Sequence, residues 1–354
     1  MTALKSLLLR QITAQGPMTV ADYMTQCLLH PQHGYYPNRD PLGAAGDFIT
    51  APEISQMFGE LLGLFLAQVW LDQGRPAPFT LAELGPGRGT LMADMLRATQ
   101  RIPGFHASLQ LHLVEASPVL RTIQTNRLAA FAPVFHQSAD SLPDQPLFLV
   151  ANEFFDALPI RQFLRVGDGW AERVVAEKDG DLCFGLTPPA PLAALAHRLP
   201  DTSESMMVEL CAPALPVMDA LQTRIASYGG VALVIDYGDW RSRGDTLQAL
   251  RQHAYDAPLA HPGEADLTAH VDFEALARAC PALRASALTP QGVFLQRLGL
   301  EMRAAQLAQN LTGDALQSHE NAYRRLTHAK EMGHLFKVMG LVHPTAPALP
   351  GLDE

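Results

Sequence analysis

The stretch that decides the fold is Ala82-Glu83-Leu84-Gly85-Pro86-Gly87-Arg88-Gly89. It lies between an apolar run that begins at Thr80 and a helical pattern that begins at Thr90. Glycine has no Cβ, so a glycine loop turns sharply and lets the backbone approach a ligand to contact distance. The stretch therefore predicts a strand, a tight turn and a helix, with a ligand at the carboxyl edge of a sheet. The alternative is a tight turn that holds no ligand.

The spacing of these glycines differs from that of a dinucleotide-binding fingerprint. A GxGxxG pattern binds a pyrophosphate at a helix N-terminus. Here the third glycine comes one residue early, at Gly89, and position 90 is a threonine. The loop therefore favours a nucleoside without a pyrophosphate, bound at Gly85 and Gly87 with Glu83 just before them.

Two acids follow the next strands of the predicted sheet. Glu115 ends the second strand, where a carboxylate accepts both hydroxyls of a ribose. Asp140 follows the third strand, in a position to accept the amino group of an adenine. Taken alone, each acid is equally well explained as a solvent-exposed side chain at the end of a strand. Together, after successive strands, they predict a nucleoside pocket.

From Phe79 onward, short apolar segments alternate with helical segments, which is typical of parallel βαβ units. The pattern predicts an α/β fold with a Rossmann-like sheet. The expected strands are Thr80 to Leu84, Gln110 to Glu115, Val134 to His136, Leu147 to Ala151 and Val231 to Asp236, with further strands at Leu247 to Leu250, Ala285 to Leu288 and Leu335 to Val342.

We expect three segments along the chain. Residues 1–75 form an N-terminal helical and lid segment, in which Thr50 to Glu53 fits a capping box. Residues 76–343 form the Rossmann-like domain, with insertions at about 161–213 and 293–332. The first insertion contains a hairpin turned at Asp179-Gly180. Residues 344–354 are expected to be a disordered tail.

Composition excludes several classes of protein. A net charge of −10 argues against a surface for nucleic acid, and no apolar stretch is long enough to span a membrane. The four cysteines are widely spaced, which favours reduced thiols and a cytoplasmic location. The segment Met1 to Gln15 could be read as a targeting segment, but an ordinary first helix fits better because no small-residue cleavage site follows it. Sequence leaves the oligomeric state open, with a homodimer possible.

Several blocks beyond the glycine loop resemble the MidA family of class I S-adenosylmethionine-dependent methyltransferases. They span roughly residues 16 to 342, and the Gly46, Asn152 and Asp266 blocks are the specific ones. The blocks are Gly16 to Met24, His33-Gly34-Tyr35-Tyr36, Gly46 to Gln56 (GDFITAPEISQ), Glu83 to Gly89, Asn152 to Pro159 (NEFFDALP), Asp236-Tyr237-Gly238 and Asp266 to Phe273 (DLTAHVDF). One departure is Glu209-Leu210-Cys211-Ala212-Pro213, where the family has Ser-Pro, and it puts a catalytic role of Glu209 in doubt.

The resemblance implies a class I methyltransferase sheet, S-adenosylmethionine as the cofactor and a protein arginine as the methyl acceptor. Mitochondrial members of the family are assembly factors of respiratory complex I, so a complex I subunit is the implied substrate. This chain looks like a bacterial-type member. Two other functions stay open: methylation of a small molecule at O or N, and an assembly chaperone that keeps the fold.

An arginine acceptor needs carboxylates, because its guanidinium stays protonated. Glu153 and Asp156 are the expected catalytic acids, with Asn152 on the cofactor side. The alternative is that both acids have structural roles, Glu153 as a hydrogen-bond acceptor and Asp156 as the cap of the next helix. Further expected residues are Gly46 and Thr50 in a lid over the cofactor, and Asp236, Tyr237 and His270 on the substrate side. The histidines lack metal-ligand spacing, so no metal is expected.

Overall fold

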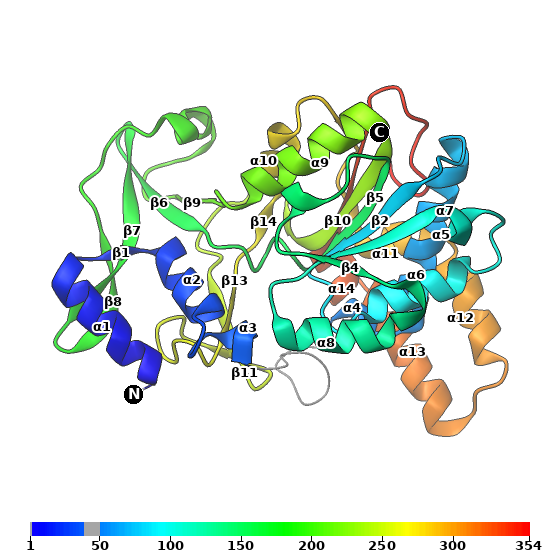
Figure 1. Cartoon of the computed structure of the whole chain (residues 1–354). Coiled ribbons are helices and arrows are strands. Elements are labelled where there is room, and N and C mark those ends of the chain that lie inside the picture. The colour runs from blue at the N-terminus through cyan, green and yellow to red at the C-terminus, as the bar shows by residue number, and fades with distance from the viewer. Residues whose placement is uncertain (1, 39–49) are drawn as a thin grey trace.

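A nine-stranded, mainly parallel sheet forms the centre of the computed structural model, which describes residues 2–38 and 50–354 (Figure 1). Its strands follow the order β15-β17-β10-β5-β2-β3-β4, with β14 beside β10 and β16 beside β17. The bounds are β2 (Phe79–Leu84), β3 (Leu109–Val114), β4 (Val134–His136), β5 (Leu147–Asn152), β10 (Gly230–Asp239), β14 (Val271–Asp272), β15 (Arg284–Ala285), β16 (Thr289–Pro290) and β17 (Phe336–Val342).

Five neighbouring strands, β10, β5, β2, β3 and β4, run parallel, and β17 runs antiparallel to β10. Every residue of β2 and β5 is buried, as expected of parallel strands covered on both faces. Side chains alternate between the faces: Leu81 packs in one core, and its neighbour Ala82 packs in the other. The predicted α/β fold is confirmed, and the five expected strands lie within three residues of their predicted ends.

Helices cover both faces of this sheet (Figure 1). One face packs against α5, α6, α11 and α12, and the other against α9 and α10. The helices of this part of the chain are α4 (Ala51–Ile54), α5 (Gln56–Asp72), α6 (Thr90–Thr99), α7 (Phe105–Ser108), α8 (Pro118–Arg127), α9 (Ala214–Tyr228), α10 (Phe273–Ala279), α11 (Gln291–Arg297), α12 (Leu300–Ala308), α13 (Gly313–Thr327) and α14 (Met332–Leu335).

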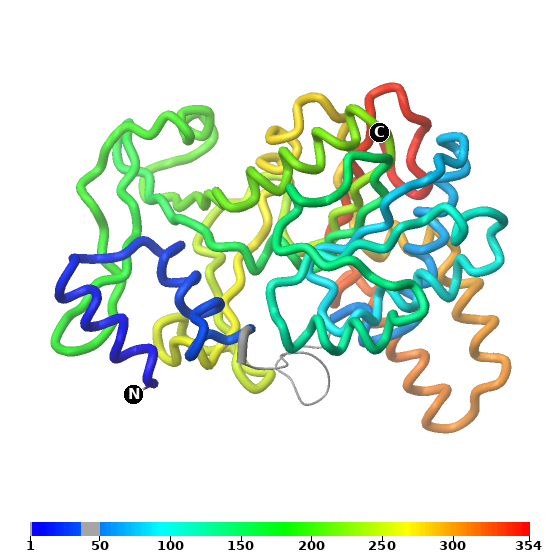
Figure 2. The backbone as a smooth tube through the Cα atoms, viewed as in Figure 1, coloured from blue at the N-terminus to red at the C-terminus, as the bar shows by residue number. Residues whose placement is uncertain are grey.

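A smaller lobe lies beside the sheet, on the left of Figure 2, where the chain is coloured blue, green and yellow. It contains an antiparallel sheet of order β1-β7-β6-β9, with β8 beside β7, and a three-stranded sheet of order β12-β11-β13. Its elements are α1 (Ala3–Gln15), β1 (Met18–Thr19), α2 (Val20–Leu29), α3 (Tyr35–Asn38), β6 (Arg161–Val166), β7 (Gly169–Lys178), β8 (Asp181–Leu186), β9 (Met207–Leu210), β11 (Gln248–Arg251), β12 (Ala254–Asp256) and β13 (Asp266–Thr268).

The expected hairpin is present as β7 and β8, and Asp179 and Gly180 at its turn have φ of 53° and 81°. Three local predictions are wrong. Residues 1–75 are not one segment, because α1 and α2 pack in the smaller lobe whereas α5 packs on the central sheet. The Thr50 side chain makes no capping hydrogen bond, and the helix restarts at Ser55. The strand expected at 285–288 is divided into β15 and β16, which both pair with β17.

The C-terminal residues are ordered against the sheet, so the predicted disordered tail is wrong. Leu349 and Leu352 are buried and pack over Gly340, where a Cβ would lie 2.3 Å from Leu349 Cδ1. The Ala287 amide donates to the Asp353 carbonyl at 2.9 Å, and Arg297 pairs with the Asp353 carboxylate at 3.0 Å. The tail is ordered because its two leucines pack on the surface that Gly340 leaves without a side chain.

This packing predicts that Leu352→Ala lowers the free energy of unfolding by about 2–4 kcal/mol, because a buried leucine is replaced by a cavity. Thermal and urea unfolding measure the change. The matched control is Leu215→Ala, at a position 56% exposed, where the loss should stay below about 0.5 kcal/mol. Equal losses in the two variants would contradict the packing of the tail.

Candidate functional site

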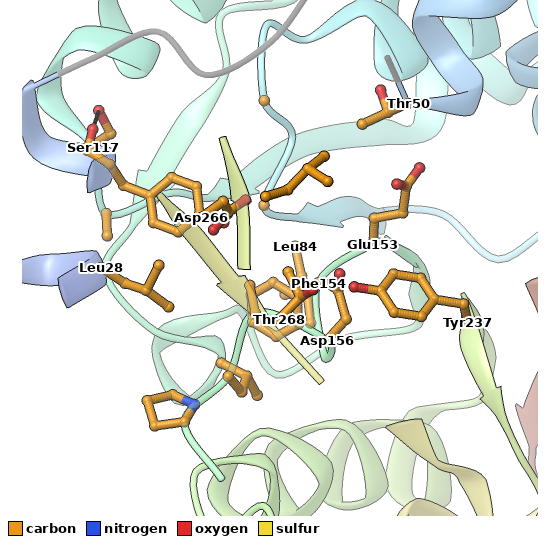
Figure 3. A pocket seen from close by; sticks show the side chains of 18 of the residues that line it. Leu28, Thr50, Leu84, Ser117, Glu153, Phe154, Asp156, Tyr237, Asp266 and Thr268 are labelled. Atoms are coloured by element: carbon orange, nitrogen blue, oxygen red, sulfur yellow. Dashed lines mark hydrogen bonds between the residues drawn. The ribbon is translucent and has the colours of Figure 1, made fainter. Parts of the chain in front are cut away.

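A cavity of about 930 Å³ lies where the carboxyl ends of β2, β3, β5 and β10 face the smaller lobe (Figure 3). Clefts at this edge of an open α/β sheet are the usual ligand sites of such folds. Its sheet-edge wall includes Leu84, Gly85, Gly87, Glu115 and Phe154. Its opposite wall comes from the smaller lobe and includes Leu28, Leu29, Tyr36, Leu250, Asp266 and Thr268.

The glycine loop presents bare backbone to this cavity. Gly85, Gly87 and Gly89 have φ of 61°, 53° and 73°, a left-handed region that other residues rarely adopt. A Cβ on Gly85 would lie 3.1 Å from the Phe154 ring. Gly89 is the N-cap residue of α6, which begins at Thr90. The predicted strand, turn and helix are therefore present, and Gly85 and Gly87 bring the backbone of the loop to the cavity wall.

Glu115 lies on the cavity wall, and each of its two carboxylate oxygens accepts one hydrogen bond, Oε1 from the Ser117 amide at 2.7 Å and Oε2 from Gln124 Nε2 at 3.1 Å. Burial raises the pKa of Glu115. A carboxylate offers about four acceptor sites, so it retains capacity for ribose hydroxyls. Around it the cavity is apolar, with side chains of Val114, Ala116, Leu120 and Ala139.

Glu83 lies behind this wall instead of on it. It is buried in β2, and a backbone hydrogen bond from Met92 reaches its carboxyl from the first turn of α6. Burial, and then the nearby Glu115, raise the pKa of Glu83 to about 8. The side chain therefore supports the start of the helix under the glycine loop.

The remaining predicted cofactor residues are placed as follows. Asp140 is exposed and does not line the cavity, because its short turn directs Ala139 inward, so the expected contact of Asp140 with an adenine is wrong. Asn152 is buried beside the cavity and donates to Glu153 Oε1 at 3.2 Å. Thr50 lines the cavity, whereas Gly46 lies outside the described residues.

Glu153 follows β5 and lines the cavity. Its φ of 51° is unusual for a residue with a side chain, and such strain is most often held at functional sites. Its amide donates to the Ile235 carbonyl at 2.9 Å, which fixes the loop on β10. Glu153 Oε1 accepts from the Ala51 amide at 3.3 Å. Burial, and then Asp156, raise the pKa of Glu153 to about 7, while Arg325 acts in the opposite direction.

Asp156 is 6% exposed and lines the same cavity, with no helix following it, so it is not a helix cap. Tyr237 directs its hydroxyl towards Asp156 (Figure 3). Among the described residues, Asp156 Oδ1 has no hydrogen-bond partner. Burial raises the pKa of Asp156 to about 6. This oxygen is therefore a buried acceptor that lacks a donor.

Asp236 does not line the cavity but supports it from behind. It accepts from the amides of Phe155 at 3.0 Å, Asp156 at 3.2 Å and Tyr237 at 2.9 Å. The expected contact of Asp236 with substrate is therefore replaced by a structural role, since Asp236 joins the loop that carries Asp156 to the strand β10 that carries Tyr237. Its pKa is raised by burial and by Asp156.

His270 lines the cavity with its ring edge-on to Tyr237, at 5.4 Å between ring centres. Burial lowers the pKa of His270, so the ring is neutral at pH 7. Its amide donates to Thr246 Oγ1 at 2.9 Å, and Thr246 in turn donates to the buried Glu209. Glu209 therefore positions the His270 backbone from outside the cavity.

Several polar residues of the cavity were not predicted from the sequence, among them Tyr36, Asp266, Thr268 and Arg325. Asp266 and Thr268 flank the core residue Leu267 on β13, so the polar-apolar-polar pattern was the available signal. Within residues 2–38 and 50–354, no group of three or more His, Cys, Asp or Glu residues is arranged to hold a metal ion. No helix in these two ranges is both long enough and apolar enough to cross a membrane.

Comparisons with known proteins give consistent matches. The model of an S-adenosyl-L-methionine-dependent methyltransferase family matches residues 61–291. Protein arginine methyltransferase NDUFAF7 of Xenopus tropicalis, a mitochondrial protein, is 38% identical, with 99% of this chain and 90% of that protein covered. The human NDUFAF7 is 36% identical, with 95% and 82% covered.

A solved structure is similar over nearly the whole chain. It is a Burkholderia thailandensis protein described as a methyl transferase candidate and bound to S-adenosylhomocysteine. Its TM-score is 0.84 at 29% identity, and the match covers 99% of this chain and 94% of that one. A second, native structure from the same organism has a TM-score of 0.81 at 29% identity, with the same coverage.

Proposed function

Because the chain belongs to the family of S-adenosyl-L-methionine-dependent methyltransferases, we propose that it methylates an arginine side chain of a protein. The observation that carries this proposal is the pair of carboxylates, the half-buried Glu153 and the buried Asp156, in a cavity that the glycine loop also lines. The relatives named as protein arginine methyltransferases support it. By resemblance, the substrate is a subunit of respiratory complex I. The cytoplasmic location and a possible homodimer stay predictions.

The cofactor wall of the cavity fits an adenosyl group. The left-handed glycines give close approach of the backbone, and Glu115 supplies acceptors for a ribose. The apolar side chains beside Glu115 suit a purine ring. When bound, the cofactor supplies the methyl group. The protein's part is to align the acceptor nitrogen with that methyl group and to exclude water.

The acceptor wall fits a guanidinium. This group carries five N–H donors and no acceptor, so carboxylates are its natural partners. Asp156 Oδ1, which lacks a donor among the described residues, would accept one of these N–H groups. Glu153 would accept another from the side of Thr50. The nitrogen that gains a methyl group must also lose a proton, and Asp156 Oδ1 would take it.

The deciding experiment incubates a lysate of cells deleted for the gene with purified protein and methyl-tritiated S-adenosylmethionine. Label should appear in protein and, after acid hydrolysis, in methylated arginines. Label only in small metabolites would instead indicate small-molecule methylation. Binding of S-adenosylmethionine without any transfer would indicate the chaperone function.

The pH profile of arginine methylation should rise between about pH 5.5 and 7.5. The pKa values of Asp156 and Glu153 are raised to about 6 and about 7, so both acids are protonated below this range and ionise within it. Only the ionised forms attract a guanidinium, so kcat/KM should increase by about tenfold or more. The labelling assay, run at fixed ionic strength, measures this rise. A flat profile would contradict the assignment of these acids to the acceptor.

A further inference from the structure

We propose that Gln124 of α8 is the positioning residue that fixes the Glu115 carboxylate for the cofactor and ties it to the glycine loop. This inference rests on the proposed cofactor wall, and it does not depend on which acceptor is methylated. Gln124 lies behind that wall and is 0% exposed. It would therefore act through the two residues in front of it, Gly87 and Glu115, which line the cavity.

The side-chain amide of Gln124 joins these two residues. Its Nε2 donates to the Gly87 carbonyl at 2.7 Å and to Glu115 Oε2 at 3.1 Å. A carbonyl and an ionised carboxylate only accept hydrogen bonds, so the NH2 end of the amide has to face them. This end has two N–H groups, one for each acceptor. The amide orientation is therefore fixed, and with it the position of the Glu115 carboxylate relative to the loop.

One face of α8 holds Glu115 both at its backbone and at its side chain. Ser117, Arg121 and Gln124 follow one another at intervals of four and three residues, which is the spacing of a single helix face. The Ser117 amide donates to Glu115 Oε1 at 2.7 Å, and Arg121 Nε donates to the Glu115 carbonyl at 2.7 Å. Gln124 holds the second carboxylate oxygen. Its removal therefore frees the carboxylate to turn about the remaining contact with Ser117.

The environment of Gln124 indicates that its amide serves the site and not the packing of the core. Its Oε1 is buried and has no hydrogen-bond partner among the described residues. A buried acceptor without a donor lowers stability, and an unbranched apolar side chain such as methionine would avoid this loss. Packing alone would therefore favour an apolar residue at this position. The two N–H groups directed at Gly87 and Glu115 explain why an amide is present instead.

The test measures S-adenosylhomocysteine binding by isothermal calorimetry in the wild type, Gln124→Met, Glu115→Ala and the double variant. Gln124→Met should raise the dissociation constant by about tenfold, because a hydrogen bond to a charged carboxylate is lost. In the Glu115→Ala background, the same substitution should raise it by less than about threefold, since the residue through which Gln124 acts is already absent.

Thermal unfolding separates this role from a structural one. The melting temperature of Gln124→Met should equal or exceed that of the wild type, because methionine fills the space and removes the unpaired Oε1. A second variant, Gln124→Glu, keeps the shape of the side chain but replaces the donor with an acceptor beside Glu115. It should weaken binding at least as much as Gln124→Met. The matched control is Asn126→Met, at an exposed amide of the same helix, which should leave binding and melting temperature unchanged.

Each outcome decides a different claim. If Glu115→Ala binds S-adenosylhomocysteine as tightly as the wild type does, the proposed cofactor wall is wrong. If Glu115→Ala weakens binding but neither Gln124 variant does, the inference about Gln124 is overturned while the wall stands. The inference is also overturned if Gln124→Met weakens binding equally in the two backgrounds, with or without a fall in melting temperature, since Gln124 would then act independently of Glu115.

Discussion

Replacing Glu115 with alanine is expected to weaken the binding of S-adenosylmethionine by about 100-fold or more. The carboxylate would accept two ribose hydroxyls, and hydrogen bonds to a charged group each contribute about 1.5–3 kcal/mol. The Ser117 amide and Gln124 Nε2 would also lose the acceptor that they bind at 2.7 and 3.1 Å. Isothermal calorimetry with S-adenosylmethionine and with S-adenosylhomocysteine measures the loss.

Asp140→Ala is the matched control for Glu115→Ala. Asp140 also follows a strand of the same sheet, but it is exposed and outside the cavity. Its removal should change the dissociation constant by less than about twofold. Unchanged binding in Glu115→Ala would show that the cofactor binds elsewhere. A loss in Asp140→Ala as large as that in Glu115→Ala would contradict the placement of Asp140 outside the site.

The second large effect is expected for Glu153→Gln, which should reduce methyl transfer by about 10²- to 10⁴-fold. Glutamine keeps the size of the side chain and still accepts from the Ala51 amide, so the loop geometry is preserved. It removes the negative charge that would hold and polarise the guanidinium. Initial rates of label transfer at saturating cofactor measure the change.

The affinity for S-adenosylmethionine is the second measurement on Glu153→Gln. It should stay within about threefold of the wild type if the residue serves the acceptor. A parallel loss of cofactor binding would instead show that Glu153, together with its neighbours Arg325 and Thr50, serves the cofactor. Unchanged turnover would remove it from the reaction altogether, and its strained backbone would then serve only the loop.

The central sheet was predictable because its signals are local. Each of the expected parallel strands is a short apolar run followed by turn residues, and the glycine loop has a conformation that few other residues adopt. The same local reading placed Glu115 at a strand end, and it lines the cavity. Local patterns could not show that Asp140 points outward. In a short turn, adjacent side chains point in different directions, and here Ala139 is the one that faces the cavity.

The acceptor wall was harder to predict because it depends on long-range packing. Tyr36 and Asp266 meet only after α3 and β13 pack together in the smaller lobe. Asp236 shows the opposite case: its position after a strand suggested contact with substrate, whereas three amides fill its carboxylate. The order of the tail also depends on packing, because Leu349 and Leu352 pack on Gly340 and the Asp353 carbonyl accepts from the Ala287 amide.

The place of β17 in the central sheet constrains how the chain folds during synthesis. This strand is the last in sequence, yet it pairs with β10 along seven residues and with β15 and β16 on its other side. When the nascent chain has emerged from the ribosome as far as α13, its sheet therefore has an open apolar edge at β10, where another nascent chain could pair. Chaperone protection should be needed until Val342 emerges, and truncations that end before Phe336 should aggregate instead of folding.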